Sequence, residues 1–156
     1  EHMLPDKDTS FALMRGAQAR GHECLHCLPR QLSHVGRELD AQARPITVSD
    51  SPPHVALEDE SRQSVGAMDA VFIRKDPPFD LEYLHLTQQL DLVKDRTFVI
   101  NDPRGLRDAN EKLYTAWFSD YCPPTLVSRF PADFRDFLGE HGDVILKPLG
   151  GMGGVS

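Results

Sequence analysis

Hydrophobic and polar positions follow two rhythms along the chain, one typical of helices and one typical of strands. Helical spacing runs through residues 7–21, 80–96, 108–118 and 131–142. The last of these predicted helices opens with Pro131 and closes at Gly142, and both residue types are favoured at those helix ends. Short apolar runs predict strands at residues 23–28, 68–76, 97–102, 123–129 and 143–148.

From residue 68 onward the predicted strands and helices alternate, which indicates an α/β fold with a parallel sheet. Residues 29–66 are polar and predict only a short strand or hairpin near 44–49, together with mobile loop. An α/β unit usually opens with a buried strand, and residues 1–8 are too short and too polar to form one. We therefore expect both ends of the chain to be interruptions of a longer protein.

Length and charge narrow the range of functions. The chain has 156 residues, enough for one ordinary domain or somewhat more, and 24 acidic against 17 basic residues give a net charge of −7. A nucleic-acid-binding protein usually carries a basic excess or a basic stripe, and this sequence has neither. It also has no apolar run of bilayer length and no signal-peptide pattern, so we expect a cytoplasmic protein without a membrane partner.

Cys24 and Cys27 form a C-x-x-C pair that is interleaved with His22 and His26. Half of a zinc site or a redox pair is one interpretation. The other is a short buried strand that uses cysteine as a small apolar residue. We favour the strand, because no second pair completes four ligands and redox pairs normally open a helix. Cys122 stands alone, and the odd count fits reduced thiols.

Candidate chemistry collects where predicted strands end, which is where open α/β sheets bind ligands. Residues 74–80, RKDPPFD, place four charges and two prolines directly after an apolar run. The prolines restrict the backbone and can aim Arg74 and Asp76, and the fork of an arginine suits a carboxylate. A solvated loop with a local salt bridge explains this segment equally well. Thr9 and Ser10 offer hydroxyls at a helix start, although an ordinary N-cap is the commoner explanation.

Two lysines point to a phosphate site. Lys112 lies in the first turn of a predicted helix, after a capping-box pattern of Asp108 and Glu111. A cation there suits an anionic ligand, although a plain surface lysine is commoner. Lys147 lies in an apolar run just before glycine-rich residues 150–154, whose backbone N–H groups can wrap phosphate oxygens. A flexible turn is the alternative for this loop, but a lysine buried in a strand would be costly without a partner.

These segments, in this order, resemble the bacterial glutathione synthetases of the ATP-grasp superfamily. The matching stretches are DKDTSFALM, RKDPPFD, PRGLRDANEKLYTAWF, PPTLVSR and DVILKPLGGMGG. The resemblance implies a Rossmann-like pre-ATP-grasp domain at residues 1–111, followed by the start of an ATP-grasp domain at 112–156. It covers most of this chain, but only the N-terminal part of the family's polypeptide.

The resemblance further implies an ATP-dependent ligase. Such an enzyme joins γ-glutamylcysteine to glycine through an acyl phosphate, with Mg²⁺ or Mn²⁺, in the cytoplasm. The acyl phosphate must be shielded from water, so a mobile lid is expected. The family forms homo-oligomers, and a tetramer is therefore the expectation for this protein.

The family's motifs also imply roles for individual residues. ATP-binding positions are Lys112, Lys147, Gly151, Met152, Gly153 and Gly154. The peptide-substrate region holds Arg74, Asp76, Thr9 and Ser10. Where Gly150 stands, the family commonly has an acidic residue, so this loop has lost a charge. The family's metal ligands lie beyond Ser156, so we expect no metal site within this chain.

Two other hypotheses stay open. Another ATP-grasp carboxylate–amine ligase is one, and the segment RKDPPFD argues against it. A short, non-catalytic binding module is the other. Because the metal ligands are missing, we expect residues 1–156 alone not to catalyse ligation.

Overall fold

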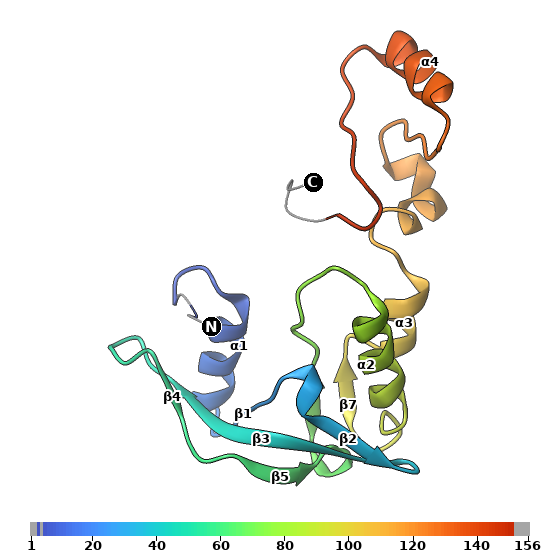
Figure 1. The fold of residues 1–156 in the computed structure, drawn as a ribbon. Coiled ribbons are helices and arrows are strands. Elements are labelled where there is room, and N and C mark those ends of the chain that lie inside the picture. Colours follow the sequence, from blue (N-terminus) through green and yellow to red (C-terminus); the bar gives the residue numbers. More distant parts are fainter. Residues whose placement is uncertain (1–2, 4, 152–156) are drawn as a thin grey trace.

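The computed structural model describes residue 3 and residues 5–151 (Figure 1). Its α-helices are α1 Thr9–Gln18, α2 Leu81–Asp91, α3 Pro103–Asp108 and α4 Pro131–His141. Its strands are β1 Leu25–His26, β2 Leu32–Val35, β3 Glu38–Val48, β4 Val55–Leu57, β5 Ser61–Ser64, β6 Ala70–Phe72 and β7 Phe98–Ile100. Short 3₁₀ helices are η1 Pro29–Gln31, η2 Val65–Ala67 and η3 Tyr114–Tyr121. Within these described residues, no helix combines the length and the apolarity needed to cross a membrane.

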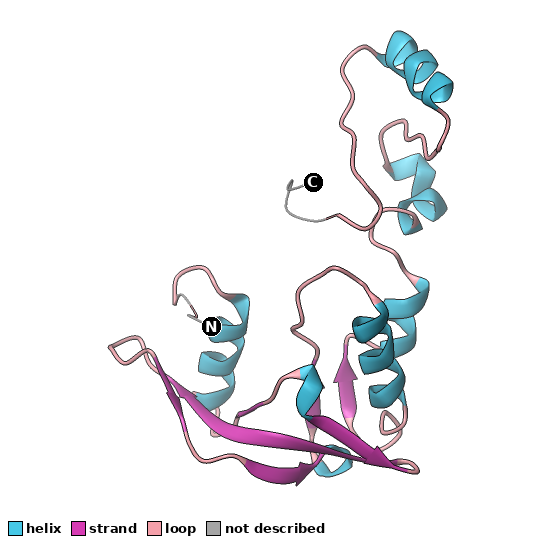
Figure 2. Ribbon diagram, viewed as in Figure 1, coloured by secondary structure: helices cyan, strands magenta, loops and turns pink. Residues whose placement is uncertain are grey.

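The α/β class is confirmed, but the parallel sheet is small. Among the described strands, only β6 and β7 pair in parallel, in the register Ala70 with Phe98 and Phe72 with Ile100. All other described pairings are antiparallel, and they join four strands to β3 in a five-stranded sheet. Figure 2 shows the strands gathered in one part of the molecule, whereas the described chain after α3 consists of helices and loops.

The expectation of little structure at residues 29–66 is wrong. This stretch contains β3, the longest strand, with which β1, β2, β4 and β5 all pair. The sequence of β3, ELDAQARPITV, hides its alternation because the buried positions include small alanines and the exposed ones carry charge. Backbone hydrogen bonds to strands on both edges of β3 keep it ordered. The pattern of apolar and polar residues does not reveal such pairing.

The main core lies between the first half of β3 and α2. Leu39, Ala41 and Ala43 of β3 pack there with Leu90 of α2 and with Val93, which follows that helix. The predicted helix at 80–96 is thus confirmed over its first part. Its buried face carries Leu86, Thr87 and Leu90, whereas Leu81 at its first position is 70% exposed.

The second half of β3 holds α1. The buried positions change parity along β3, because Ile46 and Val48 are buried but do not belong to the main core cluster. Helix α1 packs against β3, and its Phe11 is fully buried. The Gln18 side chain accepts a hydrogen bond from the backbone N–H of Val48 at 2.9 Å, so it satisfies a strand group at the end of the helix. Helix α1 itself was predicted closely from the sequence, because its cap and the spacing of its apolar residues are local features.

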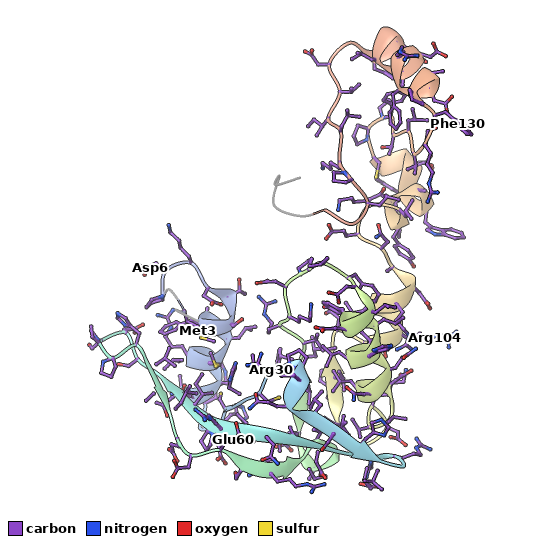
Figure 3. All side chains as sticks on the ribbon, in the orientation of Figure 1. Met3, Asp6, Arg30, Glu60, Arg104 and Phe130 are labelled. Atoms are coloured by element: carbon purple, nitrogen blue, oxygen red, sulfur yellow. The ribbon has the colours of Figure 1, made fainter. Side chains whose placement is uncertain are left out.

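Two predicted strands, 123–129 and 143–148, do not form. Neither segment pairs with another described strand, and Ile145 and Leu146 are 83% and 71% exposed. None of residues 104–151 is buried, and Phe130, labelled in Figure 3, lies far from the sheet. A strand is stable only when a neighbour takes up its backbone hydrogen bonds, and apolar character alone does not provide one.

The predicted helix at 108–118 is also wrong in its extent. Helix α3 ends at Asp108, and η3 begins only at Tyr114. Between them the side-chain oxygen of Asn110 accepts the backbone N–H groups of Lys112 and Leu113, each at 3.0 Å. This local turn competes with helix hydrogen bonding. Asn110 therefore takes the capping role that was expected of Asp108 and Glu111. Helix α4 is confirmed, and it ends at Gly142 with φ of 74°.

A cluster of charges joins α2 to α3. Arg107 donates a hydrogen bond to Asp91 at 2.7 Å, and Lys94 lies 2.8 Å from Asp91 and 3.5 Å from Asp102. The contacts with Lys94 and Arg107 hold the pKa of Asp91 below its ordinary value. The pKa of Asp102 is lowered as well, chiefly by the backbone N–H of Gly105 at the start of α3.

These lowered pKa values predict acid sensitivity. A carboxyl group whose pKa is lower in the folded state stabilises the fold above its unfolded pKa, and that stabilisation is lost as pH falls through the folded pKa. The free energy of unfolding should therefore decline as pH drops below about 4. Asp91→Asn removes one titrating group and should make the decline shallower in urea unfolding experiments between pH 2.5 and 6. Asp59→Asn is the control, because Asp59 is exposed and pairs with no described cation. Equal slopes for both variants would contradict the assignment.

Candidate functional site

The first part of the site forms around Lys112. Its ammonium group donates hydrogen bonds to the backbone carbonyls of Gly151 at 2.6 Å and Leu149 at 3.2 Å, and to the carboxylate of Glu111 at 3.0 Å. The Lys112 side chain is only 19% exposed. The turn at Asn110 sets the direction of this lysine. Asn110 was not among the residues predicted from the sequence, although asparagine is a common turn residue and gives a usable signal.

The described part of the glycine-rich loop turns at Leu149 and Gly150, and Gly151 closes the turn. The Gly151 N–H donates to the carbonyl of Pro148 at 3.2 Å, and a Cβ added at Gly151 would lie 2.5 Å from the Cγ of Pro148. A side chain at Gly151 would therefore force the Pro148 ring to shift. An added Cβ at Gly150 meets nothing within 4 Å, so the acidic residue common in the family would fit. Met152, Gly153 and Gly154 lie outside the described residues.

A groove of about 350 Å³ lies beside Lys112. Its wall is mostly apolar, with a few hydroxyl and thiol groups, and it is formed by Lys112, Leu113, Thr115, Ala116, Ser119, Cys122, Pro123, Pro124, Thr125 and Val127. Ligand pockets commonly combine such an apolar wall with a small number of polar groups. The groove and the Lys112 contacts therefore make one continuous candidate binding region.

Lys147 does not join this region through any described contact. It is exposed and makes no hydrogen bond or ion pair with the residues that the structure describes. The expectation of a lysine buried within a strand is wrong for the same reason that the strand at 143–148 is absent. No carboxylate among the described residues therefore pairs with the Lys147 ammonium group.

The second part of the site joins two segments that lie far apart in the sequence. The Arg74 Nε donates a hydrogen bond to the Ser10 hydroxyl at 3.2 Å, across 64 positions. The strand pairing continues to the base of Arg74, because the Ile73 N–H donates to the Ile100 carbonyl at 2.7 Å. On the other side, Asp8 caps α1 by accepting the Ser10 N–H at 2.7 Å. Asp8 is therefore the N-cap, one of the three residues, with Thr9 and Ser10, that could cap this helix start.

The neighbouring cation, Lys75, is held inward. It lies 5.0 Å from the centre of the Tyr83 ring and 4.0 Å from Asp80, and it donates to the backbone carbonyl of Asp76 at 3.3 Å. Asp80 also caps α2 by accepting the Tyr83 N–H at 2.8 Å. The local salt bridge that the sequence left open is thus Lys75 with Asp80. The side chains of Thr9 and Asp76 are exposed and make no hydrogen bond with the described residues.

A strand forms within the segment predicted at 23–28, but β1 spans only Leu25–His26, neither of its residues is buried, and the two cysteines lie outside it. The Cys24 thiol lies 4.0 Å from the backbone carbonyl of Met14, under α1. Burial raises the pKa of both the Cys24 and the Cys27 thiols. Residues 3 and 5–151 contain no group of three or more His, Cys, Asp or Glu side chains that could hold a metal ion. The raised thiol pKa values do not favour a redox pair, because such pairs react as thiolates.

Comparison with protein families gives two adjoining matches. Residues 1–107 match the prokaryotic glutathione synthetase, N-terminal domain. Residues 111–156 match the prokaryotic glutathione synthetase, ATP-grasp domain. The domain boundary at residue 111 stays a prediction.

Curated relatives agree with these matches. The chain is 41% identical over 157 residues to a glutathione synthetase of Salmonella typhimurium, covering 99% of this chain and 50% of the relative. It is 41% identical over 150 residues to that of Bradyrhizobium diazoefficiens, and 42% identical over 153 residues to that of Vibrio vulnificus, each covering 96% of this chain and 48% of the relative. The chain thus spans about half the length of the curated relatives it matches. It belongs to the prokaryotic glutathione synthetase family.

Proposed function

We propose that this chain is the N-terminal half of an ATP-dependent ligase that joins γ-glutamylcysteine to glycine. The observation that carries the proposal is the convergence of Lys112 with the glycine-rich loop beside an apolar groove. A cation, backbone groups at a glycine turn and an apolar wall are complementary to phosphates and to an aromatic base. The relatives are named glutathione synthetases, and the family resemblance implies these two substrates.

The chemistry needs two steps. The cysteinyl carboxylate is a poor electrophile, so one of its oxygens first takes the terminal phosphoryl group of ATP, and ADP leaves. The glycine amine then attacks the carbonyl carbon of this acyl phosphate, the C–O bond to phosphate breaks, and inorganic phosphate leaves as the amide forms. Lys112 would balance the charge of the nucleotide phosphates. Lys147 would add a second cation, and the N–H groups of residues 151–154 would close over the phosphates.

A divalent ion would accompany the nucleotide, and we propose Mg²⁺, with Mn²⁺ as a substitute. Such an ion neutralises phosphate charge during transfer. On family membership alone we also propose a cytoplasmic location and a homo-oligomer, with the tetramer as the expected form. Light scattering after gel filtration measures the oligomeric state.

The test uses the full-length protein, defined as the product of the complete reading frame that contains this chain. With ATP and Mg²⁺, phosphate release should require γ-glutamylcysteine and glycine together. Release with D-alanine alone would favour another ATP-grasp ligase and contradict the proposal. Residues 1–156 alone should release no phosphate, since the chain is half as long as its relatives.

A further inference from the structure

The segment RKDPPFD separates its two adjacent cations. Lys75 is 20% exposed on its side chain and is occupied by the Tyr83 ring, by Asp80 and by a backbone carbonyl. Arg74 is exposed, and its only described hydrogen bond is the one to Ser10. No carboxylate within residues 3 and 5–151 pairs with Arg74, not even Asp76 two positions on. Of the two cations, Arg74 is the one left available for an external anion.

The bond to Ser10 also decides which edge of the guanidinium is available. Ser10 takes the Nε–H, so the two Nη groups remain, and together they form the end-on fork that holds both oxygens of a carboxylate. Both partners have firm backbone support. Ser10 lies in the first turn of α1 under the Asp8 cap, and Arg74 follows a residue hydrogen-bonded to β7. An arginine tied at one edge loses less rotamer freedom when it binds a ligand.

We propose that Ser10 is a positioning residue that holds Arg74 by its Nε edge and aims the Nη fork at the α-carboxylate of the γ-glutamyl group. This inference rests on the proposed function. The peptide substrate has two carboxylates, and the cysteinyl one must keep an oxygen free to take up the phosphoryl group. A carboxylate held by both oxygens in an arginine fork is a weaker nucleophile. The fork therefore suits the carboxylate that does not react.

The experiment compares two substrates in the full-length protein. One is γ-glutamylcysteine, and the other is 4-aminobutanoyl-cysteine, which lacks only the glutamyl α-carboxylate. Removing that carboxylate should lower kcat/KM of the unmodified protein by about 10- to 100-fold. In Arg74→Ala the same removal should cost less than about 3-fold, because the partner of the carboxylate is gone.

Ser10→Ala tests the positioning role directly. It should raise the KM for γ-glutamylcysteine by about 3- to 10-fold, with kcat and the KM for ATP unchanged. Ser10→Thr keeps a hydroxyl and should restore the KM. The Asp8 cap binds the backbone N–H of Ser10, so it persists in both variants. Ser51→Ala, which removes an exposed hydroxyl elsewhere, is the control.

The outcomes separate the two proposals. An unmodified protein that releases no phosphate with dipeptide and glycine would overturn the proposed function and this inference with it. An active protein in which Ser10→Ala keeps the normal KM, or in which Arg74→Ala keeps the full penalty for the missing carboxylate, would overturn the inference alone. A lower kcat or a changed KM for ATP in Ser10→Ala would indicate a general structural role and would also overturn it.

Discussion

Lys112→Ala should raise the KM for ATP of the full-length protein by about 10- to 100-fold, the range expected when a charged hydrogen-bonding partner is lost. The ammonium group is mostly buried and already faces the backbone carbonyls of Leu149 and Gly151. When the nucleotide binds, its phosphates can take over this ammonium group without a large movement of the side chain. Alanine would remove both the cation and the link between the Asn110 turn and the glycine-rich loop.

The measurement is phosphate release as a function of ATP concentration, together with direct nucleotide binding by calorimetry. Lys7→Ala is the matched control, because Lys7 is exposed and makes no ion pair with the described residues. The KM for γ-glutamylcysteine should change little in Lys112→Ala. An ATP affinity that equals the unmodified value would remove Lys112 from the nucleotide site.

Phe11→Ala should lower the free energy of unfolding by about 3–5 kcal/mol, since it removes a fully buried aromatic ring and leaves a cavity. Phe11 lies in α1 where that helix packs on β3, outside the main core of β3 and α2. Few other contacts hold α1, apart from the bonds of Gln18 to Val48 and of Arg15 to Asp50. Loss of the ring should therefore loosen α1 and move Ser10 away from Arg74.

Hydrogen exchange of peptides from α1 and β3, followed in increasing urea, measures this local stability. Leu13→Ala on the same helix is the control. Leu13 is 43% exposed, so its truncation should cost about 1 kcal/mol or less. Similar losses in both variants would mean that α1 is not anchored through Phe11.

The sequence identified most of the helices better than it identified the sheet. Helices α1, α2 and α4 begin where predicted, because the side chains that cap or open them, Asp8, Asp80 and Pro131, lie within a turn of the bonds they satisfy. The parallel pairing of β6 and β7 was also expected from the helix between them. Asn110 shows the limit of periodicity, since two local bonds to its side chain replace the start of a helix that the apolar spacing favoured.

What the sequence determined by itself was the family, the α/β class and the residue types that can meet an anion. Only the tertiary structure decided that β3 is the central strand, that Lys75 is withdrawn while Arg74 is available, and that Ser10 meets Arg74 across 64 positions. The physical reason is the range of the bonds. Helix hydrogen bonds and caps join residues within about four positions, so the local sequence contains both partners. Strand pairing and side-chain contacts between distant segments exist only after the chain has folded. A local sequence pattern contains only one of the two partners in each contact.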